Sequence, residues 1–277
     1  MQRLRRLVRQ RSRRAVEGAC VVEGPRAIAE ALRAGARVES LYVAPGPLGP
    51  SGSAVVEEAA RHGVRLFPLA AGVAERVADT VTSQGLFAIV ATVAEPIERL
   101  AGARLVLVGL SLRDPGNAGT LVRSAAAAGA DGVVFAGTSV DPFNPKTVRA
   151  SAGAVFHLPL VVAPDPREAL EALRAGGMRC LAGLAHGGVD YRVAPLGGPL
   201  ALVLGNEAHG IDPSLAGCVD GGVTIPLARG ESLNVAVAGS ILAFAAAGAS
   251  ESRSRVPVEG LAAETAVGRP PEKEEEP

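Results

Sequence analysis

The sequence predicts an α/β protein built from two domains that are joined by a short linker. Segments rich in β-branched and other apolar residues alternate with helix-forming segments, first over residues 15–94 and again, with stronger strands, over residues 104–250. The chain has 277 residues, which suits two modest domains better than one. Two strand candidates, Leu105–Val108 and Leu200–Leu204, are continuously apolar, which is typical of a parallel sheet covered by helices on both faces.

Residues 15–94 predict a small α/β domain. We expect strands at Ala19–Val22, Ser40–Val43, Val64–Phe67 and Leu86–Val93. We expect helices at Pro25–Ala34, Ala54–Arg61 and Val73–Ala78. The stretch Gly46–Ser53 is rich in Gly, Pro and Ser, so it is expected to be a surface loop.

A basic segment, residues 1–14, precedes this domain. Seven arginines lie between Arg3 and Arg14, whereas the formal net charge of the whole chain is zero. The segment is expected to be a solvated, partly helical arm or, as an equal alternative, an arm that contacts nucleic-acid phosphates. Because bulk charge does not mark a nucleic-acid-binding protein here, any such contact has to come from local patches.

The second domain follows a linker at Ala94–Ala103. We expect its strands at Arg104–Leu110, Gly132–Phe135, Leu160–Val162, Met178–Leu184, Leu200–Leu204 and Val223–Ile225. We expect its helices at Ala118–Ala128, Pro145–Val155, Pro166–Ala175 and Leu233–Ala247. Pro, Glu and Arg dominate from Glu251 onward, so residues 251–277 are expected to form a disordered tail.

Composition argues against several classes of protein. The longest apolar stretch, Val235–Gly248, is too short to span a bilayer, and no signal peptide opens the chain, so we expect a cytoplasmic protein with no membrane partner. The three cysteines lie far apart with no CxxC pair, and the four histidines have no metal-ligand spacing. We therefore expect neither a disulfide framework nor a bound metal ion.

Polar loops after the strands of the second domain are the candidate ligand sites, because ligands of open α/β sheets bind beyond the carboxyl ends of the strands. The sequence has no GxGxxG after the first of these strands and no GxxxxGK(S/T), which weakens the dinucleotide and nucleoside-triphosphate interpretations. In the first polar segment, Leu112–Arg123, Asn117 is expected to cap the helix that follows. Arg123 lies in that apolar, alanine-rich helix, so its guanidinium needs a partner or a polar cleft.

Two further segments carry polar side chains next to buried elements. Glu207 follows the apolar strand Leu200–Leu204, and Gly205 beside it permits a close backbone approach. In the third segment, Ser232 is expected to cap the last helix, but capping does not explain Asn234 inside an apolar helix. Each segment alone also fits an ordinary turn or cap.

Together the segments resemble the SpoU/TrmH family of RNA ribose 2′-O-methyltransferases, which belong to the trefoil-knotted SPOUT superfamily. Asn117–Arg123 resembles the first motif of the family, and Gly205–Glu207 resembles its second motif. Pro226 together with Ser232–Asn234 resembles its third motif. A further likeness is Asn144–Ala154, and the resemblance extends from Leu105 to about Gly248. The N-terminal part is similar to the L30e-like RNA-binding domain of the rRNA-directed branch.

The resemblance implies a C-terminal SPOUT methyltransferase domain that binds S-adenosylmethionine and an N-terminal domain, residues 15–94, that binds the RNA substrate. The implied cofactor-binding residues are Leu204, Gly205, Ile225, Leu227, Leu233 and Asn234. The implied catalytic residues are Arg123, Asn117, Glu207, Ser232 and Asn234. Family members are homodimers, and the apolar last helix fits burial at a subunit interface as well as it fits the core.

The role of Arg123 stays open between a base and an electrostatic stabiliser. A guanidinium is essentially always protonated, so we favour phosphate binding and stabilisation of negative charge on the ribose oxygen. Other interpretations also remain: a nucleotide-binding α/β enzyme such as a Rossmann dehydrogenase, and a non-catalytic RNA-binding module. Within the family the substrate is expected to be 23S rRNA, with tRNA as the alternative, and protection against an antibiotic that targets ribosomes is a further possibility.

Overall fold

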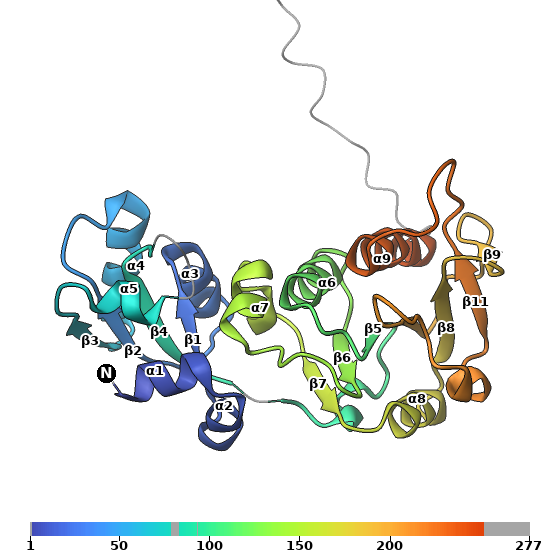
Figure 1. Ribbon diagram of the computed structural model, residues 1–277, viewed down its shortest axis with the longest axis horizontal. Helices are drawn as coiled ribbons and strands as arrows, with labels where there is room; N and C mark the ends of the chain where they lie inside the picture. The colour runs from blue at the N-terminus through green and yellow to red at the C-terminus, as the bar shows by residue number, and fades with distance from the viewer. Residues whose placement is uncertain (1, 79–82, 93, 252–277) are drawn as a thin grey trace, which may run out of the picture.

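The computed structural model describes residues 2–78, 83–92 and 94–251, which form two α/β domains side by side along the long axis (Figure 1). The residues of the expected tail beyond Glu251 lie outside this range. In the described part of the chain, no helix is long and apolar enough to cross a membrane.

The N-terminal domain is a mixed sheet with helices on both faces. Its strand order is β1-β4-β2-β3, with β4 antiparallel to both β1 and β2 and with β2 parallel to β3. The strands are β1 (Ala19–Glu23), β2 (Val38–Val43), β3 (Arg65–Pro68) and β4 (Leu86–Ala91). The helices are α1 (Gln2–Arg9), α2 (Arg11–Glu17), α3 (Pro25–Arg33), α4 (Gly49–Arg61) and α5 (Val73–Val77).

Alternation along β1 assigns its side chains to the two faces. Cys20 and Val22 pack with α3 and α4, whereas Ala19 and Val21 pack with α1 and α5. Successive side chains of a strand point to opposite faces, so a short strand of apolar residues can anchor two layers of helices. This pattern explains why β1 is buried along most of its length.

The basic N-terminal segment is helical, as predicted, and its leucines pack against the sheet, while all but one of its seven arginines stay exposed. Leu4 and Leu7, three residues apart on one side of α1, are fully buried. Arg14 is only 5% exposed and forms an ion pair with Asp141 of the second domain. The segment is mostly charged in sequence, but burial of Leu4 and Leu7 fixes its position against the sheet.

The C-terminal domain is built on a parallel sheet with the strand order β7-β6-β5-β10-β8-β11-β9. Its strands are β5 (Leu105–Leu110), β6 (Gly132–Ala136), β7 (Leu160–Ala163), β8 (Arg179–Leu184), β9 (Val189–Asp190), β10 (Leu200–Leu204) and β11 (Gly221–Thr224). The α-helices are α6 (Pro115–Ala127), α7 (Pro145–Ala150), α8 (Pro166–Ala175) and α9 (Val235–Glu251). The 3₁₀ helices are η1 (Ile97–Leu100), η2 (Ala154–Phe156) and η3 (Pro213–Cys218).

Helices cover both faces of this sheet, as the continuously apolar strands predict. Residues of α6 and α9 pack in one cluster with Leu107 and Leu202, whereas residues of α8 and η3 pack in another with Val106 and Val108. In Figure 1, α6 and α9 lie on one side of β5, β6 and β8, and α8 lies on the other. The fold therefore leaves the carboxyl ends of the strands for a ligand.

Helix boundaries differ from the predictions at several points, and for α6 the reason is that a residue other than the predicted Asn117 caps the helix. Asp114 is the N-cap of α6, since its carboxylate accepts from the backbone N–H of Asn117 at 2.7 Å, and Pro115 occupies the first turn. Helix α4 begins at Gly49, inside the expected loop Gly46–Ser53. Helix α7 ends at Ala150, just before Ala152 adopts a left-handed conformation with φ of 52°.

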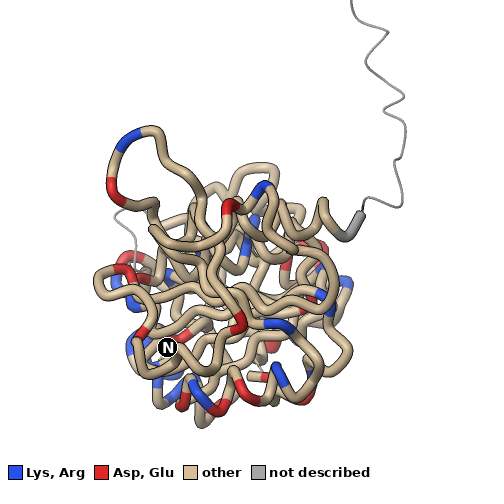
Figure 2. Tube along the Cα trace, turned by 90° about the vertical axis from the view of Figure 1, so that its right-hand side faces the viewer, with Lys and Arg blue, Asp and Glu red and all other residues tan. Residues whose placement is uncertain are grey.

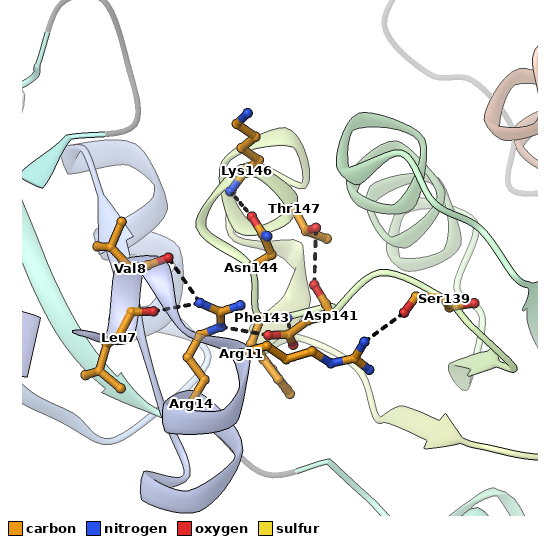
Figure 3. A network of polar contacts seen from close by, with 10 residues as sticks. All are labelled: Leu7, Val8, Arg11, Arg14, Ser139, Asp141, Phe143, Asn144, Lys146 and Thr147. Carbon is orange, nitrogen blue, oxygen red and sulfur yellow. Dashed lines mark hydrogen bonds and ion pairs between the residues drawn. The ribbon is translucent and has the colours of Figure 1, made fainter. Parts of the chain in front are cut away.

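A buried polar network joins the two domains (Figure 3). The Nε of Arg14 donates to Asp141 at 2.6 Å, and its Nη1 donates to the carbonyls of Leu7 and Val8 at 2.7 and 3.1 Å. The other carboxylate oxygen of Asp141 accepts from the N–H of Phe143 at 2.9 Å. Because the pair is buried and its remaining groups are hydrogen-bonded, removing one partner alone leaves an uncompensated charge.

Candidate active site

A cavity of about 540 Å³ opens at the carboxyl ends of β8, β10 and β11, on the side of the sheet that α6 and α9 cover. Loops after these strands and the first turns of α9 form its walls. All six residues predicted to bind the cofactor line this cavity: Leu204, Gly205, Ile225, Leu227, Leu233 and Asn234. Four of the five predicted catalytic residues line it: Asn117, Glu207, Ser232 and Asn234, the last of which is predicted for both roles.

Gly205 is required by the tight loop that follows β10. A Cβ at this position would lie 2.3 Å from the carbonyl carbon of Gly210, a distance that side-chain motion cannot relieve because the contact is with backbone. The backbones of Asn206 and Gly210 exchange hydrogen bonds of 2.8 and 2.9 Å and close the loop. The absence of a side chain at Gly205 therefore lets the loop fold back beside the cavity.

Asn206 fixes this loop to the end of β5. Its Nδ2 donates to the carbonyl of Ser111 at 2.7 Å, and its Oδ1 accepts from the backbone N–H groups of Ala208 and His209 at 2.9 and 3.2 Å. Ser111 has a φ of 53°, which a non-glycine residue rarely adopts. The motif contains Asn206, but its structural role was not predicted, because the partner carbonyl lies far away in the sequence.

One chain of hydrogen bonds brings the three sequence motifs together. The Nδ2 of Asn234 donates to the Oδ1 of Asn117 at 2.9 Å, and the Nδ2 of Asn117 donates to Glu207 at 3.1 Å. The Glu207 carboxylate also lies 3.5 and 3.4 Å from the backbone nitrogens of Arg113 and Asp114. These hydrogen bonds thus connect the first turn of α6, the loop after β10 and the start of α9.

These contacts keep Glu207 ionised. Partial burial raises the pKa of this carboxyl, but hydrogen bonds from Asn117 and from the backbone N–H groups of Glu207, Asp114 and Arg113 outweigh it, so the net pKa lies below the ordinary value. At neutral pH, Glu207 is therefore a negatively charged acceptor.

Asn234, not Ser232, caps the last helix. Its Oδ1 accepts from the backbone N–H groups of Ala236 and Val237 at 2.9 and 3.2 Å, and α9 begins at Val235. The prediction of Ser232 as the cap is wrong because the helix starts later than expected. Ser232 is exposed on the cavity wall, and its hydroxyl has no hydrogen-bond partner within the described residues.

Arg123 is the one predicted site residue that does not line the cavity. It lies six positions beyond Asn117 on α6, which places it about 9 Å further along the helix axis. Its side chain is exposed and forms neither a hydrogen bond nor an ion pair with any residue that the structure describes. The guanidinium is therefore available to a group outside this chain.

The charge of the cavity lining fits a cationic ligand. Glu207 is the charged side chain in the lining of the cavity. Within residues 2–78, 83–92 and 94–251, there is no group of three or more His, Cys, Asp or Glu that could hold a metal ion. Figure 2, which views the end of the C-terminal domain, shows basic and acidic positions interspersed rather than separated by sign.

Two family models match this chain. Residues 104–244 match the SpoU rRNA Methylase family, and residues 1–88 match the MRM3-like substrate binding domain. The second match includes the basic N-terminal segment, in agreement with its packing against the sheet.

Curated relatives and solved structures agree with these matches. The chain is 34% identical over 225 residues to the 23S rRNA (guanosine(2553)-2′-O)-methyltransferase RlmP of Bacillus subtilis, covering 81% of this chain and 86% of the relative. It is 31% identical over 256 residues to the 23S rRNA (adenosine(1067)-2′-O)-methyltransferase of Streptomyces laurentii, covering 87% of this chain and 90% of the relative.

Among solved structures, the SpoU methyltransferase AviRb of Streptomyces viridochromogenes in complex with AdoMet matches with a TM-score of 0.77 and 28% identity, covering 89% of this chain and 96% of that chain. An AdoMet-bound rRNA methyltransferase of Sinorhizobium meliloti matches with a TM-score of 0.77 and 29% identity, covering 88% and 92%. These findings confirm the predicted α/β fold and the prediction of an RNA methyltransferase that uses S-adenosylmethionine, and the chain belongs to the SpoU rRNA methylase family.

Proposed function

We propose that this enzyme transfers a methyl group from S-adenosylmethionine to the 2′-hydroxyl of one ribose in 23S rRNA. The observation that supports it best is the meeting of the three motifs: Asn117, Glu207 and Asn234 form one network on the wall of a cavity that all six expected cofactor-binding residues line. The choice of 23S rRNA rests on the two named relatives, whose substrates are different nucleotides of that RNA.

The cavity fits the cofactor in size and in charge. Its volume of about 540 Å³ lies in the range of small-molecule sites. Leu204, Ile225 and Leu233 supply apolar walls, and Glu207 supplies a negative charge near the wall, which suits a sulfonium cation. When bound, S-adenosylmethionine supplies the methyl group that is transferred.

Side chains on the cavity wall, together with Arg123 further along α6, position the reacting groups. Asn117, held between Asn234 and Glu207, presents its amide in a fixed orientation. Arg123 binds an RNA phosphate and stabilises the negative charge that develops on the ribose oxygen, while the hydroxyl proton passes to bulk water, because a guanidinium keeps its own proton and cannot accept another. Ser232 retains a free hydroxyl beside this network and contacts the ribose.

We propose a homodimer as the working form. Val237 and Phe244 on α9 are 45% and 53% exposed, which leaves apolar surface on the helix that borders the cavity. Arg123 is free of partners among the described residues of its own chain, which fits a site completed across two subunits.

We also propose that the C-terminal domain contains a trefoil knot and that the protein is cytoplasmic. The parallel order of β5, β10, β8 and β11 is consistent with the knot.

The test is incubation with tritiated S-adenosylmethionine and, in separate reactions, 23S rRNA, large ribosomal subunits or tRNA, followed by nucleoside analysis. We expect one labelled 2′-O-methyl nucleoside from 23S rRNA or the subunit. Label in tRNA alone would move the substrate to tRNA. Tight RNA binding without transfer to any RNA would favour a non-catalytic RNA-binding module.

A further inference from the structure

A second cavity, of about 580 Å³, lies at the same edge of the sheet but on the face that α8 covers. Leu110 at the end of β5, Thr138 after β6, Pro166 at the start of α8 and Leu215 of η3 line it. The cofactor cavity, in contrast, is lined by residues of α6 and α9. The two cavities therefore lie on opposite faces of the sheet, at the edge where its strands end.

A wall one loop thick separates the two cavities. Asn206 and Gly210 line both of them. The loop 206–210 is tied to the chain after β5 through the bond from Asn206 to the carbonyl of Ser111 and through the contacts of Glu207 with the backbone of Arg113. Glu207 lines the cofactor cavity, whereas Arg113 and His209 line the second cavity.

Two planar side chains of the second cavity have no partner among the described residues. Arg113 and His209 are exposed, and within that part of the protein neither side chain forms a hydrogen bond or an ion pair. Arg167 differs, since its guanidinium donates to the carbonyl of Ser214 at 2.5 Å and contacts the Sγ of Cys218 at 3.3 Å. A free guanidinium and a free imidazole thus share one cavity lining with the apolar residues Leu110, Pro166 and Leu215. Guanidinium and imidazole planes are groups on which unstacked RNA bases stack.

Polar acceptors complete the lining. The Asp212 carboxylate is exposed, and hydrogen bonds from Ser214 lower its pKa, so it is ionised at neutral pH. The hydroxyl of Thr138 is exposed and has no partner among the residues described. Planar stacking groups and hydrogen-bond acceptors in one lining suit a heterocyclic base that carries ring N–H or amino groups.

We propose that this cavity holds the base of the nucleotide whose ribose is methylated. The inference rests on the proposed function, because it needs an RNA ribose beside Asn117 and Glu207. A nucleotide whose 2′-hydroxyl reaches the cofactor cavity then places its base across the shared loop, in the second cavity. Arg113, His209 and Thr138 thereby contribute to the choice of nucleotide without contacting the cofactor.

The experiment compares Arg113→Ala, His209→Ala and Thr138→Phe with the wild type. The substrates are the RNA identified by nucleoside analysis and the same RNA with an abasic nucleotide at the methylated position. The matched control is Arg104→Ala, an exposed arginine at the opposite end of β5. Affinity for S-adenosylmethionine is measured by calorimetry, and single-turnover transfer is measured on both RNAs.

We expect Arg113→Ala and His209→Ala to methylate the normal RNA about 5- to 150-fold more slowly, the range for losing one stacking contact with a base. Thr138→Phe should also slow transfer to the normal RNA, because its ring fills space that the base needs. Cofactor affinity and the Arg104→Ala variant should stay normal. On the abasic RNA, the variants should match the wild type. Equal losses on both RNAs, or no loss on the normal RNA, would overturn the proposal. Absence of transfer by the wild type would instead refute the proposed function.

Discussion

Two polar networks in this molecule contrast in nearly every physical respect. The network at the domain junction is charged and buried: Arg14 and Asp141 are 5% and 9% exposed (Figure 3). The network at the cofactor cavity is mostly neutral and exposed, and it runs from Asn234 through Asn117 to Glu207. Both connect residues that are far apart in the sequence, so both depend on the complete fold.

The two networks differ in how many hydrogen-bonding groups they leave without a partner. At the junction, Arg14 already donates to a carboxylate and to two carbonyls, and no buried side-chain polar atom in the described part of the protein lacks a partner. Such a network fixes geometry and has no capacity for a ligand. Ser232 on the cavity wall and Arg123 further along α6 keep donors that no described residue engages, so a substrate can bind to them. The substitutions below test this division.

The largest effect is expected on stability at the junction. Arg14→Met leaves Asp141 buried without its cation, which should lower the free energy of unfolding by about 3–5 kcal/mol. A loss of that size should lower the midpoint of thermal unfolding by roughly 6–20 °C for a chain of this length. Thermal and urea unfolding, followed by circular dichroism, measure it.

The control is the double variant Arg14→Met with Asp141→Asn. The introduced amide is neutral and keeps an acceptor for the N–H of Phe143, so the double variant should lose clearly less than the sum of the two single losses. Strict additivity of the single losses would contradict the direct coupling of Arg14 to Asp141.

The second prediction concerns the role of the exposed Arg123 in catalysis. Arg123→Ala should slow methyl transfer by about 10²–10³-fold, as expected for a group that stabilises developing negative charge. The stability should change by no more than about 0.5 kcal/mol, because the side chain has no partner in the described fold. Single-turnover rates and thermal unfolding measure the two effects. Near-normal transfer by Arg123→Lys would refute a requirement for the planar guanidinium.

The sequence predicts the elements well where apolar runs are long. Strand β10 has the predicted bounds, Leu200–Leu204, because a fully buried strand needs apolar residues at every position. Helix ends were predicted less well. Asp114 and Asn117 are both good N-caps, and the proline at position 115 was the available sign that the helix begins with Asp114.

The site was predicted from motif resemblance and not from physical pattern. Leu204, Ile225 and Leu233 are apolar residues whose position beside the cavity no periodicity distinguishes from ordinary core. The bond between Asn117 and Asn234 joins segments 117 positions apart, so only the folded sheet brings them together. The burial of Arg14 was missed for the same reason, because its partner Asp141 belongs to the other domain.

The third prediction separates the two roles of Asn234. Asn234→Ala removes the N-cap of α9, which should cost about 1 kcal/mol of stability, and it removes the bond to Asn117. Affinity for S-adenosylmethionine should fall about 5-fold, the effect of one lost hydrogen bond. Asn234→Ser restores a cap but not the reach to Asn117, so it should recover stability without affinity. If Asn234→Ser recovered both stability and affinity for S-adenosylmethionine, cofactor binding would require only the N-cap of α9 and not the hydrogen bond to Asn117.

The smallest effect is the pH dependence that Glu207 contributes. Its pKa is below the ordinary value in the folded protein, so above the unfolded-state pKa of about 4.3 its hydrogen bonds stabilise the fold fully. As the pH falls through that value, the unfolded state binds a proton first, and the contribution is lost until the folded-state pKa is passed. Urea unfolding of wild type and Glu207→Gln between pH 7 and pH 3 measures the difference.

The stability difference between the two proteins should be constant from pH 7 to about pH 5 and should shrink below about pH 4. The effect should be small because Glu207 is exposed and solvent screens its interactions. A difference that grows toward low pH would mean that the fold favours protonated Glu207, which would reverse its assignment as the fixed negative acceptor of the cofactor cavity.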